Sequence, residues 1–122
     1  MKLKELAKEL KAKFIHIPEN YKDIDIKFAG ASDLMSDFLA FSTPGMLLVT
    51  GLTTPQTLTT ASVIEAGAIL FVRGKTIPKT FLENIEDCEI PLLTTDYSMF
   101  YACVKLYKLG IKDAMKTDEE SL

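Results

Sequence analysis

The chain has few of the residues that mark specialised classes of protein. Its 122 residues include no tryptophan, one histidine, two cysteines, six glycines and five prolines. So few glycines and prolines exclude collagen-like and low-complexity classes. Cys88 and Cys103 are too few for a disulfide scaffold, and their spacing matches no metal-ligand or redox motif. With 48% hydrophobic residues, the chain is expected to form one globular domain.

Long apolar runs and an excess of basic charge are also absent. No stretch approaches the roughly 20 apolar residues that span a bilayer. Lysines are spread through residues 2–11, where the apolar part of a signal peptide would lie, so we expect a cytoplasmic protein. The net charge of −3 is opposite in sign to that of a typical nucleic-acid binder. We therefore expect neither a membrane nor a nucleic acid as partner.

The first third of the chain predicts a mixture of helices and short strands. Apolar residues recur at helical spacing over residues 3–14, between lysines and glutamates. Short strands are predicted over 14–17 and 24–28. Small and acidic residues at 30–33 have the chemistry of a helix cap, and a helix is predicted over 34–41.

From residue 46 the pattern becomes a regular alternation of apolar runs and helical segments. The runs cover 46–50, 68–72 and 90–94, and Gly110 is expected to end the last helix. Unbroken apolar strands separated by helices are typical of a parallel sheet covered on both faces. The predicted fold class is α/β, a single three-layer α/β/α domain with a mostly parallel central sheet. We expect it to span residues 1–111, followed by a disordered acidic tail over 112–122.

Hydroxyl-bearing and small residues gather in the loops that follow the predicted strands. Ligands of open α/β sheets bind outside the carboxyl ends of the strands, where hydroxyls and backbone N–H groups can hold an anion. Arg73, the only arginine, would supply positive charge, and the aspartates would cap helices or accept hydrogen bonds from a ribose. The alternative is that these residues only cap helices. The candidate ligand-binding residues are Ser32, Asp33, Thr50, Gly51, Thr53, Arg73, Thr95 and Asp96.

Catalytic residues are scarce. His16 is the only histidine and lies in a predicted strand, and neither a Walker loop nor a Gly-x-Gly-x-x-Gly motif is present. Asp33 and Asp37 would share one helix face, which is at best a weak metal site. We therefore expect no enzymatic activity, no cofactor and no bound metal. The less favoured alternative is a small metal-dependent hydrolase or transferase that uses this aspartate pair.

The last predicted helix carries only Lys105 and Lys108 as charged residues between Asp96 and Gly110. A helix that is apolar nearly all round is either deeply buried or covered by another chain. Burial under the first helix is one alternative, and docking on another polypeptide is a second. We favour a homodimer formed through Met99, Phe100, Cys103 and Tyr107.

The order of these motifs resembles the stand-alone DRTGG-domain proteins. The resemblance rests on residues 29–37, on 65–68 and on 90–98, with 29–37 the most specific part. It implies an α/β/α domain similar to the N-terminal domain of HPr kinase/phosphorylase, a module also found fused to CBS domains. The turn at 73–75 departs from the glycine-rich turn of the family. The resemblance implies a regulatory or oligomerising module and does not imply kinase activity. Together with the loop residues it leads us to expect a non-catalytic regulatory module that binds a small anionic metabolite or a nucleotide at the strand-to-helix loops. The alternative is a structural interaction module without a ligand.

Overall fold

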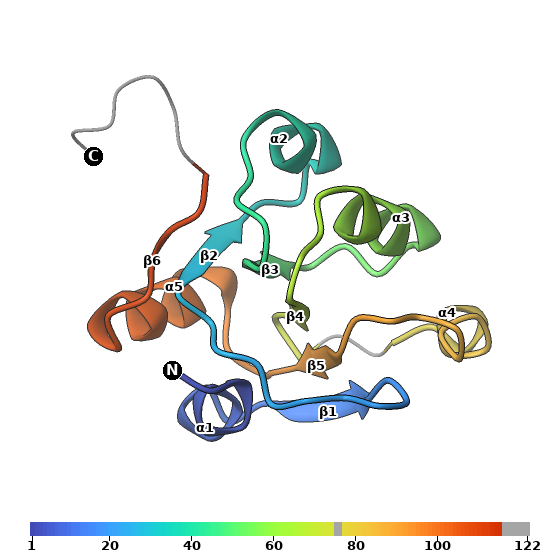
Figure 1. The fold of residues 1–122 in the computed structure, drawn as a ribbon, viewed down its shortest axis with the longest axis horizontal. Helices are drawn as coiled ribbons and strands as arrows, with labels where there is room; N and C mark the ends of the chain where they lie inside the picture. The colour runs from blue at the N-terminus through green and yellow to red at the C-terminus, as the bar shows by residue number, and fades with distance from the viewer. Residues whose placement is uncertain (75–76, 116–122) are drawn as a thin grey trace.

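The structure is a computed structural model that describes residues 1–74 and 77–115. Helices and strands alternate along most of the chain (Figure 1). In chain order they are α1 (Leu3–Glu9), β1 (Lys13–His16), β2 (Phe28–Ala31), α2 (Met35–Ala40), β3 (Leu47–Thr50), α3 (Pro55–Val63), β4 (Ala68–Phe71), α4 (Lys79–Leu82), β5 (Leu92–Thr94), α5 (Met99–Lys108) and β6 (Lys112–Asp113).

The strands form one six-stranded sheet in the order β1-β5-β4-β3-β2-β6. In the described part of the chain, the five strands β5, β4, β3, β2 and β6 are parallel to one another. Strand β1 lies at the edge and pairs with β5 in the antiparallel direction. All residues of β3 and β4 are buried, which explains why these strands read as continuous apolar runs in the sequence. The predicted mostly parallel sheet is therefore confirmed.

Two hydrophobic cores lie on opposite faces of the sheet, because successive residues of a strand point to opposite sides. On one face Leu47, Val49 and Leu70 pack with side chains of α1 and α5. On the other face Leu48 and Ile69 pack with side chains of α2, α3 and α4. Helices therefore cover both faces (Figure 1), and the predicted three-layer α/β fold is confirmed. No helix in the described parts of the chain has both the length and the apolar character that crossing a membrane requires.

The predicted end of the last helix is also confirmed. Gly110 has a φ of +87°, in the left-handed region that glycine adopts without strain. Its N–H donates to the Tyr107 carbonyl at 3.0 Å, and the Ile111 N–H donates to the Leu106 carbonyl at 3.1 Å. These two bonds form the Schellman motif that ends many helices.

Several boundaries differ from the predictions. The helical pattern over 3–14 gives α1 as Leu3–Glu9, with Phe14 in β1, and β5 begins at Leu92 and not at residue 90. The strand expected over 24–28 is wrong in position, since β2 begins at Phe28 and ends at Ala31. Ile26 is buried, but its N–H bonds to the carbonyl of Met1 and not to a sheet neighbour. At the other end, residues 112–115 are not a free tail, because β6 pairs with β2 and Ala114 is fully buried. The remainder of the predicted tail, 116–122, lies outside the described residues.

Candidate functional site

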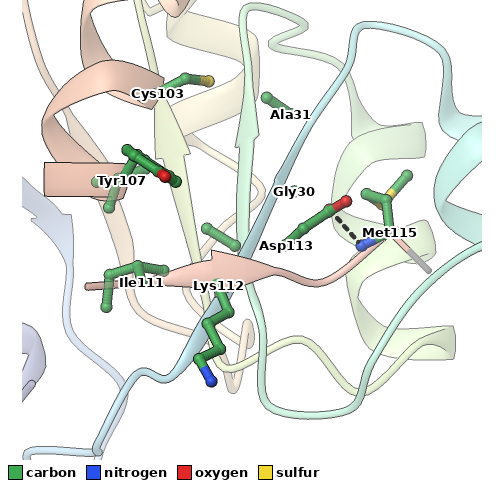
Figure 2. A pocket seen from close by; sticks show the side chains of 10 residues that line it. Gly30, Ala31, Cys103, Tyr107, Ile111, Lys112, Asp113 and Met115 are labelled. Atoms are coloured by element: carbon green, nitrogen blue, oxygen red, sulfur yellow. Dashed lines mark hydrogen bonds between the residues drawn. The ribbon is translucent and has the colours of Figure 1, made fainter. Parts of the chain in front are cut away.

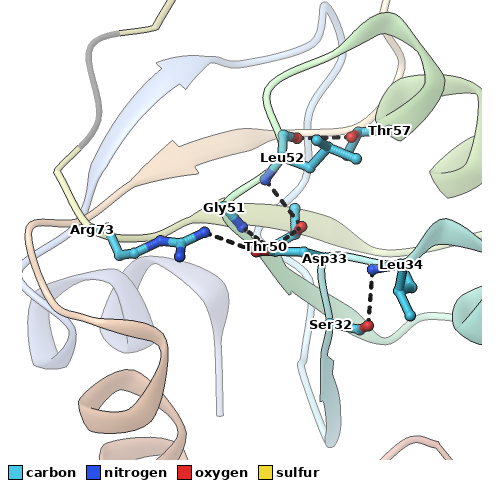
Figure 3. A network of polar contacts seen from close by, with 8 residues as sticks. All are labelled: Ser32, Asp33, Leu34, Thr50, Gly51, Leu52, Thr57 and Arg73. Atoms are coloured by element: carbon cyan, nitrogen blue, oxygen red, sulfur yellow. Dashed lines mark hydrogen bonds and ion pairs between the residues drawn. The ribbon is translucent and has the colours of Figure 1, made fainter.

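The carboxyl ends of β2, β3 and β4 bring four of the predicted site residues together. The three strands are parallel neighbours, so their carboxyl ends lie along the same edge of the sheet. Asp33 follows β2, Thr50 ends β3 and precedes Gly51, and Arg73 follows β4. Their polar groups form one connected set of contacts (Figure 3), which we call the Asp33 network.

The Asp33 carboxylate is the centre of this network. Its Oδ1 accepts hydrogen bonds from the Gly51 N–H at 2.7 Å and from the Thr50 hydroxyl at 3.1 Å. Its Oδ2 accepts from Nη2 of Arg73 at 2.8 Å. Partial burial raises the pKa of Asp33, but the hydrogen bonds from Gly51, Arg73 and Thr50 outweigh burial and hold it below its ordinary value. The carboxylate is therefore stabilised in its charged form.

The loop after β4 takes a tight left-handed turn that positions Arg73. Arg73 and Gly74 have φ values of +72° and +56°. The N–H groups of these two residues donate to the carbonyls of Tyr97 and Thr95, at 2.7 and 2.9 Å. A Cβ at Gly74 would lie 2.6 Å from Oδ1 of Asp96, so the Asp96 side chain packs against this turn. The turn thus joins the loop after β5 to the edge of the network.

The other predicted site residues have different surroundings. The Ser32 hydroxyl donates to the Asp37 carboxylate at 3.0 Å and accepts from the Leu34 N–H at 3.0 Å, beside the network. Thr53 is partly buried in the loop between β3 and α3. Thr95 differs most from its prediction, because its buried hydroxyl donates to the carbonyl of Leu10 at 2.7 Å, near the end of α1. Its oxygen therefore bonds within the core and does not join the network.

The charges of the site are more acidic than the sequence suggested. Arg73 is paired with Asp33, Asp37 in α2 bonds to Ser32, and Asp96 in the loop after β5 packs against the turn at Gly74, so two further carboxylates lie beside the network. Among residues 1–74 and 77–115, no group of three or more histidine, cysteine, aspartate or glutamate side chains could hold a metal ion. Asp33 and Asp37, the predicted aspartate pair, bond to different partners: Asp33 to Gly51 and Arg73, and Asp37 to Ser32.

Two threonines next to the network were missed in the sequence. Thr57 is fully buried, and its hydroxyl donates to the Leu52 carbonyl at 2.7 Å (Figure 3). The Leu52 N–H in turn donates to the Thr50 hydroxyl oxygen at 3.1 Å, which connects the start of α3 to the network. The Thr54 hydroxyl oxygen is buried without a hydrogen-bond partner in the described part of the chain. The threonine-rich run over 53–60 is the sequence signal for this group.

Two cavities lie away from the Asp33 network. One, of about 340 Å³, lies between α5 and the strands β2 and β6, and Figure 2 shows its lining, including Cys103, Tyr107 and Met115. The other, of about 700 Å³, lies between α3 and residues 84–90. The residues of the Asp33 network line neither of these two cavities.

Helix α5 has one buried and one exposed apolar face. Ala102 and Leu106 pack into the core that includes residues of α1, as the burial alternative predicts. Phe100 and Tyr107 are 80% and 81% exposed, and Cys103 lies between them in the helix, half-buried. Burial raises the pKa of the Cys103 thiol. A large apolar surface of the helix therefore remains uncovered in the single chain.

Comparison with known proteins supports the fold. No protein-family model matches the chain, and no curated protein matches it in sequence. A solved structure that matches is that of the CBS and DRTGG domains of the regulatory region of Clostridium perfringens pyrophosphatase, complexed with its activator, diadenosine tetraphosphate. The TM-score is 0.67 at 16% identity, and the match covers 96% of this chain and 51% of that one. The likeness supports a DRTGG-like fold, and the chain spans about half the length of its structural neighbour.

Proposed function

We propose that the chain is a non-catalytic regulatory module that binds a small anionic ligand, a nucleotide or another phosphorylated metabolite, at the Asp33 network. The observation that carries the proposal is the convergence of three donors on one anionic group. A backbone N–H, a hydroxyl and a guanidinium meet there, from Gly51, Thr50 and Arg73. This donor set suits phosphate or carboxylate oxygens.

The structural neighbour supports the same class of function. That region of the pyrophosphatase is regulatory and is described with a nucleotide activator. We also propose that the domain is similar to the N-terminal domain of HPr kinase/phosphorylase and that the protein is cytoplasmic. We propose that the regulatory domain extends over residues 1–115, since β6 pairs with the sheet.

Isothermal titration calorimetry of the purified chain with AMP, ADP, ATP, diadenosine tetraphosphate and inorganic phosphate tests this function. We expect saturable binding of at least one compound, weakened about tenfold or more by Arg73→Ala, because a charged hydrogen-bond donor is lost. Lys22→Ala is the matched control, since it removes one positive charge from an exposed residue outside the network. Failure of all five compounds to bind would contradict the proposal.

A second candidate function is self-association through α5. The observation that favours it is the exposure of Phe100 and of Tyr107, which also lines the cavity between α5 and the strands β2 and β6. Large exposed aromatic side chains are typical of the centres of protein interfaces. The occupant that we propose for this surface is a second copy of the chain, in which the same face of α5 packs in the antiparallel direction.

Charge and spacing along α5 favour the antiparallel arrangement. Asp96 precedes the helix, and Lys105 and Lys108 lie toward its end, so antiparallel packing brings opposite charges closer together. Phe100 and Tyr107 are equally distant in sequence from the midpoint between residues 103 and 104. A two-fold axis at that midpoint places Phe100 of one copy against Tyr107 of the other, with the two Cys103 residues near the axis.

Multi-angle light scattering and thiol cross-linking test the dimer. We expect a dimer that Phe100→Ser dissociates, and a short bismaleimide should cross-link the wild-type chain through Cys103. Cys88→Ser should keep the cross-link and Cys103→Ser should abolish it, which makes the two half-buried cysteines each other's control. A wild-type monomer without cross-links would contradict self-association and leave another polypeptide as the alternative partner.

A further inference from the structure

We propose that Asp33 occupies the anion site of its own chain, so that a ligand phosphate binds by displacing the Asp33 carboxylate from Thr50, Gly51 and Arg73. This inference rests on the proposed function and adds a mode of regulation to it. Asp33 then acts as a competitor of the ligand and not as one of its contacts.

The first argument is that two of the donors are held more firmly than the carboxylate that accepts from them. Thr50 is fully buried and Gly51 is buried, and parallel pairing of β3 with its neighbours holds the backbone at the end of this strand. Asp33 lies in the loop between β2 and α2, with 44% of its side chain accessible. Thr50 and Gly51 are therefore held in place by the sheet, whereas the side chains of Arg73 and Asp33 are 42% and 44% exposed. The Asp33 carboxylate can turn away from the two donors of the sheet into solvent.

The second argument is the way in which the Asp33 loop is anchored. Ser32 accepts from the Leu34 N–H and donates to Asp37, and its own N–H donates to the Val49 carbonyl at 3.1 Å. These bonds hold the backbone on both sides of Asp33 without using the Asp33 side chain. Release of the carboxylate consequently requires only side-chain rotation, and the loop keeps its attachment to β3.

The third argument concerns the chemistry of the ligand. A carboxylate offers two oxygens and one negative charge, whereas a terminal phosphate offers three oxygens and up to two charges. A phosphate can satisfy the same three donors and interact more strongly with Arg73. The displaced Asp33 remains nearby and repels the bound anion, which lowers the affinity. Asp33 would thereby set the phosphate concentration at which the module responds.

Calorimetric titration with inorganic phosphate and with AMP tests the displacement. We expect Asp33→Ala and Asp33→Asn each to increase the affinity about fivefold or more, because the competing ion pair with Arg73 is removed. Asp37→Asn is the matched control: it removes one negative charge from a partly buried neighbour that bonds to Ser32 and to none of the three donors, and its amide oxygen can still accept from Ser32. We expect a change of about twofold at most, since this carboxylate does not occupy the donors. Thermal denaturation of each variant establishes that it is folded, and Asp33→Asn keeps the shape of the side chain.

The outcomes separate this inference from the function on which it rests. If both Asp33 variants bind phosphate as the wild type does or more weakly, the displacement is wrong and ligand binding itself still stands. An equal gain in Asp37→Asn would also overturn it, because general charge would then explain the effect. If neither the wild type nor any variant binds phosphate or AMP, the proposed function fails and the displacement fails with it.

Discussion

The guanidinium of Arg73 lies over Gly51, in the space that a Cβ at position 51 would fill. Glycine at this position therefore permits the ion pair between Arg73 and Asp33. The backbone of Gly51 does not need a positive φ, so close approach and not backbone freedom explains the glycine.

Gly51→Ala should displace the Arg73 side chain and break its ion pair with Asp33. Because both partners are more than 40% exposed, we expect a loss of stability of about 1 kcal/mol or less, measured by chemical denaturation. Ligand binding should weaken as in Arg73→Ala. The control is the double variant Gly51→Ala with Arg73→Ala, because Gly51→Ala should lower the stability less once the arginine side chain is absent. Additive effects in the double variant would show that the two positions do not interact.

Acidification should remove a stabilising contribution of Asp33. The pKa of this carboxyl is lower in the folded chain than its ordinary value of 3.8. Its contribution is therefore fully present above that ordinary value and is lost as the pH falls through the lower, folded value. Urea denaturation between pH 6 and about pH 2.5 should show a smaller decrease in stability for Asp33→Asn than for the wild type. Equal pH profiles would contradict the role of the Asp33 network in holding this charge.

Thr95→Val should destabilise the fold without affecting ligand binding. The substitution removes the buried hydroxyl that donates to the Leu10 carbonyl, and the expected loss is about 1 to 3 kcal/mol. Thr59→Val is the matched control, because the Thr59 hydroxyl is exposed and makes only a long bond to the Pro55 carbonyl. Loss of ligand affinity in a folded Thr95→Val variant would contradict this prediction and show that Thr95 takes part in ligand binding.

Ala114→Asp should be strongly destabilising, although residue 114 was expected to belong to a disordered tail. Ala114 is fully buried beside β2, so the substitution places an unpaired charge in the core. We expect a loss of about 3 kcal/mol or more in chemical denaturation. Lys112→Ala, at an exposed position of β6, should have little effect. If Ala114→Asp were as stable as the wild type, the docking of residues 112–115 would be refuted.

The sequence predicted those helices and strands that are determined by residues close together in the chain. The runs that form β3 and β4 are apolar at every position except Thr50 at the end of β3, because both faces of these strands are buried. Gly110 could be placed at the end of α5 because the left-handed turn there suits glycine. The loops at the carboxyl ends of the strands were also predictable, since parallel strands place their carboxyl ends at one edge of the sheet.

The tertiary structure decided which side chains in those loops meet. Asp33 and Arg73 are forty residues apart, and their ion pair depends on β3 lying between β2 and β4. Thr95 has the same local sequence signal as the other loop hydroxyls, but α1 places the carbonyl of Leu10 within its reach, eighty-five residues away. Sequence alone therefore determined where hydroxyl and charged groups accumulate. The order of the strands and the packing of α1 determined which of these groups form the network and which support the core, because hydrogen bonds depend on distances in the folded chain.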